Sequence, residues 1–227
     1  MSYRLRRLII SLLTIAGFAF IIFAAAPPII EETTTPTPVP VAAGSAREAL
    51  ETLAVKGRAP KTGYARAEFG SGWATVNGCD TRNIILHRDL IDVVVDEKCN
   101  VTSGTLHDSY TGTIIAFSRS DGSAVQIDHV VALSNAWQTG AQLISKEDRT
   151  RLANDPLELI AVDGQANQEK LDADAASWLP SNKSFRCEYV ARQVAIKQKY
   201  TLWVTPAEKE AIVGVLNSCP DQGLPVK

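Results

Sequence analysis

The chain has 227 residues, of which 45% are apolar and 21% are charged, the balance of an ordinary globular protein. This composition excludes a mainly fibrous or disordered protein. With 23 Lys and Arg against 25 Asp and Glu, the formal charge of −2 also excludes a strongly basic protein that coats nucleic acid. Any phosphate-binding surface must therefore be confined to one site.

The first 26 residues form a segment that we expect to direct export. Three arginines within the first seven residues precede an uncharged apolar run over positions 8–26. A basic flank followed by an apolar run is typical of a secretory signal peptide or of a signal anchor that stays in the membrane. The run is just long enough to span a bilayer and is long for a cleaved signal peptide, which slightly favours a retained anchor. The domain is therefore expected outside the cytoplasm, either secreted or anchored in the membrane through residues 8–26.

Residues 27–44 are rich in Pro and Thr, a composition typical of extended spacers. This places the folded domain at 45–227.

All four cysteines lie in that domain, and no Cys-x-x-Cys pair occurs, so a structural zinc site is not expected. An even number of cysteines in an exported chain favours two disulfides. Three pairings are open, and nearest neighbours along the chain give Cys79–Cys99 and Cys187–Cys219.

The domain mixes helical and strand patterns. Helices are expected after Ser45, over 145–153, over 165–176, through 185–195 and from Thr205 onward. Short apolar runs predict strands at 113–117, 125–131 and 159–162. The Asp121-Gly122 turn predicts that the first two of these strands pair as a hairpin. Trp73, Trp137 and Trp178 are expected in the core. The predicted fold class is α+β, with several helices and short antiparallel strands.

Asp128 and His129 are adjacent polar residues inside an apolar strand pattern. Neighbouring residues of a strand point to opposite faces, so both cannot be solvent-facing unless the strand ends or bends. Because an unpaired buried carboxylate is costly, Asp128 should have a cation or hydrogen-bond donors nearby. The alternative to a functional pair is a salt-bridged Asp beside a hydrogen-bonded core His. His87 and His107 are expected at the surface.

A strand, a turn and a polar helix follow at 158–170, with Asn167 on the first turn of the helix. One carboxylate, one amide oxygen and several waters form a ligand set that suits Mg²⁺. A His beside such an ion can take a proton from water, since its ordinary pKa of about 6.5 suits a base near neutral pH. Asp128, His129 and Asn167 together are thus a more specific signal than any one of them.

The segments Ile127–Leu133, Asn154–Val162 and Asn167–Lys170 together resemble the His-Asn-His (HNH) endonucleases. Among these they are similar to the GmrSD C-terminal-like group of exported bacterial proteins. The likeness extends to short segments at 77–83, 110–112 and 178–187, and so covers most of positions 60–220. It implies a ββα-metal (His-Me finger) core, in which two strands and a helix hold one divalent ion.

On this resemblance, His129 matches the general base that activates water, Asp128 the first metal ligand and Asn167 the metal ligand on the helix. Glu158 stands where the family places the Asn that braces the loop and orients the His. An ionised Glu can accept a hydrogen bond from the imidazole, but it cannot donate one as an amide does. Two outcomes stay open: bracing by another group, for which Asn154 is a candidate, or reduced activity.

Cationic side chains should hold the phosphate backbone at such a site, and the candidates are Lys170, Lys183, Arg186 and Arg82. An ordinary solvated surface charge is the alternative for each of them. Lys170 is favoured as a residue of the catalytic centre, because it lies three positions after Asn167 on the same helix face.

The implied function is that of a metal-dependent phosphodiesterase that cleaves nucleic acid, DNA without sequence preference, outside the cytoplasm. Mg²⁺ is the expected cofactor, with Mn²⁺ or another divalent cation as substitutes. A Ser-His-Asp hydrolase is disfavoured because no Gly-x-Ser-x-Gly elbow occurs. The remaining alternative is a non-catalytic, membrane-tethered envelope module that retains the nuclease fold. A chelator distinguishes the two, since only the nuclease loses an activity with its metal.

Overall fold

The computed structural model describes residues 44–225. The predicted export segment, with the membrane anchoring expected of residues 8–26, and nearly all of the spacer lie outside the described residues. No helix within 44–225 is long and apolar enough to cross a membrane.

The described part of the chain is an α+β structure with seven α-helices and three small antiparallel sheets, which confirms the predicted fold class. The helices are α2 (Ala46–Glu51), α3 (Thr81–Asp89), α4 (Leu133–Gln138), α5 (Lys146–Ala153), α6 (Gly164–Lys170), α7 (Arg186–Lys199) and α8 (Pro206–Leu216). The strands are β1 (Thr75–Val76), β2 (Cys79–Asp80), β3 (Leu90–Val95), β4 (Val101–His107), β5 (Ile114–Ser118), β6 (Val125–His129) and β7 (Leu159–Asp163). Short 3-10 helices are η1 (Arg66–Phe69), η2 (Arg119–Asp121), η3 (Ala141–Leu143) and η4 (Lys183–Phe185).

The predicted hairpin between the strands around 113–117 and 125–131 is wrong. β5 pairs with β4, whereas β6 pairs with β7, and η2 separates β5 from β6. Burial explains this choice of partners. Most of β6 and β7 is buried, while β5 leaves Ile114 69% exposed and belongs to a sheet with a solvated face. β7, which is almost wholly buried, is the strand whose burial matches that of β6.

Helix starts follow local capping as expected. Ser145 accepts a hydrogen bond from the Asp148 backbone N–H at the start of α5, and Thr205 with Glu208 forms a capping box at α8. The polar helix predicted over 165–176 is shorter. It ends at Lys170, because Leu171 adopts φ +52° and ψ −122°, which no α-helix can continue.

Both predicted disulfides are present. Cys79–Cys99 joins β2 to the turn between β3 and β4, and Cys187–Cys219 joins the start of α7 to the chain after α8. The Cα–Cα separations of 5.5 and 6.5 Å lie in the ordinary range for disulfides.

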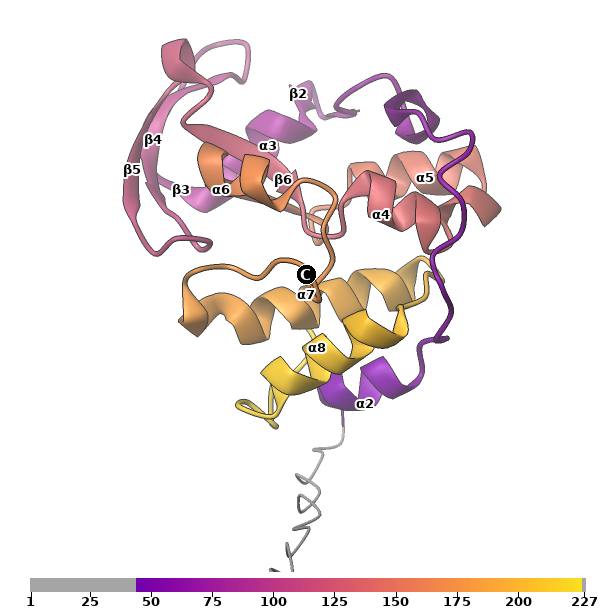
Figure 1. Cartoon of the computed structure of the whole chain (residues 1–227). Helices are drawn as coiled ribbons and strands as arrows, with labels where there is room; N and C mark the ends of the chain where they lie inside the picture. The colour runs from indigo at the N-terminus through magenta and orange to yellow at the C-terminus, as the bar shows by residue number, and fades with distance from the viewer. Residues whose placement is uncertain (1–43, 226–227) are drawn as a thin grey trace, which may run out of the picture. The chain divides into compact units, whose positions relative to one another are not determined.

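The pair β6–β7 lies between groups of helices (Figure 1). On one side of the pair lie α7, α8 and α2. Helix α6 packs on both strands of the pair, and α3 packs against β7. A Cβ atom at Gly164 would lie 1.9 Å from the carbonyl oxygen of Ser123. Only glycine therefore fits where α6 begins, and this close approach fixes α6 beside the start of β6.

Candidate active site

The antiparallel pair β6–β7 followed directly by α6 forms the expected ββα unit. Asp128 lies opposite Ile160 and His129 lies opposite Leu159 in the register of the two strands. Asp128 and His129 are both 6% exposed, so the strand buries both polar residues. Strand alternation sends their side chains to different faces, and each therefore needs its own polar partners.

Asp128 has the donors that its burial requires. Its Oδ2 atom accepts a hydrogen bond from the hydroxyl of Tyr110 at 2.5 Å, and it lies 3.0 Å from the Nζ atom of Lys170. Lys170 also donates to the carbonyl oxygen of His129 at 2.8 Å. Burial and the neighbouring Asp128 carboxylate raise the pKa of Tyr110 well above 10, so its hydroxyl remains a donor. The expectation that Asp128 has a cation and donors nearby is confirmed.

The imidazole of His129 is held in one protonation state by its surroundings. Its Nε2 atom lies 3.0 Å from the carbonyl oxygen of Ala153. A carbonyl only accepts, so Nε2 carries the hydrogen and Nδ1 is the unprotonated, basic nitrogen. Burial lowers the pKa of His129 to about 3; the Ala153 carbonyl opposes this shift, and the positive charges of Arg66 and Lys170 add to it. The ring is therefore neutral at neutral pH.

The ring of Trp73 lies parallel to the His129 imidazole, with an interplanar angle of 6° and 5.9 Å between centroids. Trp73 is only half-buried, so the prediction of a plain core residue misses this stacking role. Asn154 holds the same segment: its Oδ1 atom accepts a hydrogen bond from the Ala74 backbone N–H at 2.8 Å. Asn154 therefore acts on the His129 surroundings through the chain that carries Trp73.

Glu158 braces the backbone after His129 and makes no hydrogen bond with the imidazole. Its Oε2 atom accepts from the Val131 N–H at 3.1 Å, and its carbonyl oxygen accepts from the Val130 N–H at 2.9 Å. The side chain is fully buried, and its Oε1 atom has no hydrogen-bond partner. Burial raises the pKa of Glu158 well above its ordinary value, although the Val131 N–H and the Lys170 charge oppose the shift. A protonated Glu158 is thus the form that this interior favours.

His129 lies at the edge of a cleft of about 290 Å³, which we call the His129 cleft. Its lining includes Asp128, His129, Asn167, Gln126 and Arg66. The Nδ2 atom of Asn167 donates to Oε1 of Gln126 at 2.9 Å, which fixes the amide of Asn167 beside β6. Asp128, His129 and Asn167 thus all contribute to the lining of this cleft, while the Asp128 carboxylate contacts the buried Tyr110 and Lys170.

The cation that faces the His129 cleft is Arg66 from η1, an exposed residue whose charge is close enough to lower the pKa of His129. The structure does not bring the three predicted surface cations there. Lys183 lies exposed in η4, Arg186 donates to the carbonyl oxygen of Pro180 at 2.7 Å, and Arg82 is half-buried in α3. Each belongs to an element outside the ββα unit.

Lys170 requires a correction of a different kind. The prediction that it contacts phosphate rested on its sharing a helix face with Asn167, but its side chain is fully buried. The ammonium group points inward to Asp128 and to the His129 carbonyl. Lys170 therefore supports the positions of the two strand residues and does not reach a substrate in the cleft.

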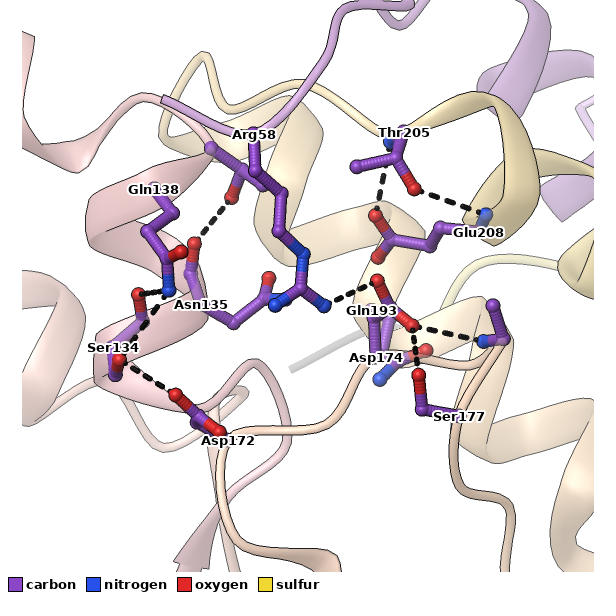
Figure 2. Close-up of polar contacts among 12 residues, drawn as sticks. Arg58, Ser134, Asn135, Gln138, Asp172, Asp174, Ser177, Gln193, Thr205 and Glu208 are labelled. Atoms are coloured by element: carbon purple, nitrogen blue, oxygen red, sulfur yellow. Dashed lines mark hydrogen bonds and ion pairs between the residues drawn. The ribbon is translucent and has the colours of Figure 1, made fainter. Parts of the chain in front are cut away.

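Hydrogen bonds and ion pairs hold the segment after α6, residues 171–174, to other parts of the domain. Asp172 accepts a hydrogen bond from the Ser134 hydroxyl at 2.9 Å and pairs with Lys61 at 3.1 Å. Two residues later, Asp174 pairs with Arg58 at 2.7 Å (Figure 2). The Ser134 hydrogen bond and the Lys61 ion pair lower the pKa of Asp172, and partial burial opposes this shift only in part. This segment is thus held to α4 and to the chain before η1.

A larger cleft of about 620 Å³ shares no lining residue with the His129 cleft and so does not include Asp128, His129 or Asn167. It is lined by four cationic side chains, each of which pairs with an acidic side chain of the domain: Arg88, Arg151, Arg192 and Lys199. Because these charges are neutralised internally, this cleft is a weaker candidate for phosphate binding.

Two residues that line the His129 cleft, Asp128 and Asn167, carry oxygen atoms of the kind that Mg²⁺ binds. Within residues 44–225, no three His, Cys, Asp or Glu side chains are grouped to hold an ion. Mg²⁺ does not need such a group, because it keeps several waters and binds one or two carboxylates. A carboxylate has about four acceptor positions. On Asp128, Tyr110 uses one on Oδ2, and the Lys170 ammonium lies 3.0 Å from Oδ2 and 3.1 Å from Oδ1, so one position stays open. Asn167 carries an amide oxygen, and its amide nitrogen donates to Gln126.

Comparison with known proteins places this chain in a family. A family model for the C-terminal domain of GmrSD restriction endonucleases matches residues 80–215, more than half of the chain. The chain belongs to this family. An uncharacterized secreted protein of Arthroderma benhamiae is similar, at 40% identity over 193 residues, which cover 82% of this chain and 92% of that protein. No solved structure matches the chain significantly.

The GmrSD C-terminal match contains the Asp128, His129, Glu158, Asn167 and Lys170 positions and confirms the resemblance seen in the sequence. It also makes a nuclease-related function the coarse conclusion for this chain.

Tyr64 and Arg66, which line the His129 cleft, and Trp73, which stacks on His129, were not predicted as parts of the site. All three precede the part that matches the GmrSD C-terminal domain, and no local pattern connects them to His129. Gln126 did leave a signal, because it lies two residues before Asp128 on the same strand face.

Proposed function

We propose that this chain is a metal-dependent endonuclease that cleaves DNA without sequence preference. The observation that carries the proposal is the arrangement of a neutral His129, with Nδ1 unprotonated, in one cleft with Asp128, Asn167 and Arg66. A base, two oxygen ligands and a phosphate-binding cation are the groups that hydrolysis of a phosphodiester needs.

Each residue has a distinct part in this proposal. His129 accepts the proton of the attacking water at Nδ1, while its Nε2–H stays on the Ala153 carbonyl. Asp128 and Asn167 hold a Mg²⁺ ion, which when bound supplies positive charge that stabilises the developing charge on the phosphate and leaving oxygen. Arg66 binds a phosphate oxygen from the solvent side of the cleft.

Supporting residues keep these groups in place. Lys170 and Tyr110 fix Asp128, Trp73 limits the rotation of the His129 ring, and Glu158 holds the turn that follows β6. The replacement of the family's Asn by Glu158 is compatible with activity in this proposal, because Glu158 braces the backbone through an acceptor and needs no amide donor.

The test uses the purified full chain with its disulfides intact, incubated with supercoiled plasmid and Mg²⁺ or Mn²⁺. We expect nicked and linear DNA, loss of cleavage with EDTA, and loss with His129→Ala or Asn167→Ala. Circular dichroism verifies that both variants are folded, and a parallel reaction with RNA defines the substrate class. If the folded protein binds Mn²⁺ but cleaves neither nucleic acid, the non-catalytic envelope module replaces this proposal.

We also infer that the protein is exported. The similar protein from Arthroderma benhamiae is described as secreted, two disulfides are present, and the N-terminal sequence has the basic and apolar pattern of an export signal. Mass spectrometry of the exported protein tests the fate of that segment. An N-terminus near residue 27 indicates cleavage and secretion, whereas an intact Met1 on membrane-associated protein indicates an anchor.

A further inference from the structure

Leu171 combines two properties that folding alone does not favour. Its side chain is 74% exposed at the edge of the His129 cleft, and its backbone has φ +52° and ψ −122°. A side chain with a Cβ atom is strained in that backbone conformation, whereas glycine adopts it readily. An exposed leucine also leaves apolar surface in water. Glycine at this position would remove both costs.

The residues on either side explain how the strained conformation is maintained. On one side, the buried Lys170 forms an ion pair with Asp128. On the other, Asp172 accepts a hydrogen bond from the Ser134 hydroxyl of α4 (Figure 2). The chain must turn sharply between these two anchors, so position 171 carries the turn. This accounts for the backbone conformation but not for a large apolar side chain there. Strained residues that the surrounding structure holds in place are concentrated at functional sites.

The surroundings of Leu171 match the surface of a nucleic acid. The same cleft carries the exposed Arg66 guanidinium and the amide of Gln126 beside the proposed base His129. A nucleic acid presents anionic phosphates next to apolar sugar and base surfaces, and minor-groove proteins use leucine among the apolar side chains that contact base surfaces. A cation and an exposed apolar side chain on one cleft are therefore complementary to one strand and its sugars.

We propose that Leu171 packs against the sugar and base surface of the nucleotide next to the scissile phosphate and so holds the substrate in register with His129. This inference rests on the proposed nuclease function. It assigns Leu171 to substrate binding and not to the chemical step. Its removal should therefore raise KM and leave kcat nearly unchanged.

The binding test uses the full chain carrying His129→Ala, which prevents cleavage, and a short fluorescein-labelled DNA duplex. Fluorescence anisotropy compares this parent with versions that also carry Leu171→Ala or Leu171→Gly. We expect each to raise Kd by about five- to tenfold, the effect of losing most of one buried leucine side chain. The matched control is Leu143→Ala, because Leu143 is 76% exposed and lies away from the cleft. It should leave Kd unchanged.

A stability measurement tests the strain independently of substrate. Leu171→Gly should have a melting temperature about 2–4 °C above that of Leu171→Ala, because glycine relieves the backbone strain. Equal melting temperatures would contradict the strain on which the argument depends. DNA binding that neither Leu171 variant weakens overturns this inference alone. A wild-type protein that neither binds nor cleaves DNA or RNA overturns the proposed function as well.

Discussion

The Nζ atom of Lys170 lies 3.0 Å from Oδ2 of Asp128, and both side chains are buried. The ion pair connects α6 to β6 beneath the His129 cleft. It gives the carboxylate that we propose as a metal ligand a fixed position before any ion binds. Because the Lys170 ammonium also donates to the His129 carbonyl, one side chain positions both residues of the Asp-His pair.

Lys170→Met should destabilise the protein by about 3–5 kcal/mol, since it leaves the Asp128 carboxylate buried without its counter-charge. Urea unfolding followed by circular dichroism measures this. Lys209→Met is the matched control, because Lys209 pairs with Glu51 at the surface, where an ion pair contributes less than about 1 kcal/mol. The double variant Asp128→Asn/Lys170→Met should recover part of the loss. Similar small losses for both single variants would show that the buried pair does not stabilise the fold.

Glu158→Gln should change how stability depends on pH. Burial raises the pKa of Glu158 in the folded protein above its ordinary value of 4.5, which it keeps in the unfolded chain. Between these two pKa values the unfolded chain releases the Glu158 proton more readily than the folded protein, so the free energy of unfolding of the wild type falls as pH rises. Gln does not titrate. Above about pH 4.5 the variant should therefore gain stability relative to the wild type. The difference in the free energy of unfolding should grow by up to about 1.4 kcal/mol per pH unit. Unfolding curves at several pH values test this; a difference independent of pH would mean that Glu158 is ionised in the folded protein without cost.

Arg66→Ala should lower kcat/KM for DNA by roughly tenfold or more, because an Arg–phosphate contact is a charge-assisted hydrogen bond. The slope of log Kd against log salt concentration should also fall by about 1, since one phosphate contact is lost. Arg66 is exposed, so its removal should not unfold the protein. Lys183→Ala provides the control: Lys183 is equally an exposed cation, but it does not line the His129 cleft. Equal effects of the two variants would contradict the assignment of Arg66.

Cys187→Ser/Cys219→Ser should lower the free energy of unfolding by about 3–4 kcal/mol. The bond closes a loop between residues 32 apart in sequence, and its removal frees that loop in the unfolded chain. It also releases the start of α7 from the end of α8. Urea unfolding of the variant against the oxidised wild type measures the loss. Wild type treated with a reducing agent should lose at least as much, and an unchanged midpoint for both samples would rule out a stabilising role for this bond.

Sequence was sufficient where the physical cause is local. The starts of α5 and α8 are determined by side chains that accept a hydrogen bond from a backbone N–H three residues later, so Ser145 and Thr205 identify them directly. The even set of cysteines and their nearest-neighbour spacing predicted both disulfides. The burial of Asp128 beside His129 likewise implied the cation and donors that Lys170 and Tyr110 supply.

Only the tertiary structure decided which groups meet. β6 pairs with β7 and not with its neighbour β5, because matched burial outweighs closeness in sequence. Lys170 points inward, because the buried Asp128 carboxylate and the His129 carbonyl oxygen there accept hydrogen bonds from its ammonium group. Arg66 reaches the cleft from a segment about sixty residues before His129 in the printed sequence. The sequence by itself thus determined the starts of α5 and α8 through contacts between near neighbours, favoured the disulfide pairing that is present, and indicated Asp128, His129 and Asn167 as candidates through family resemblance. The strand partners, the direction of Lys170 and the cation of the cleft depend on contacts between residues far apart in the chain, which no local pattern records.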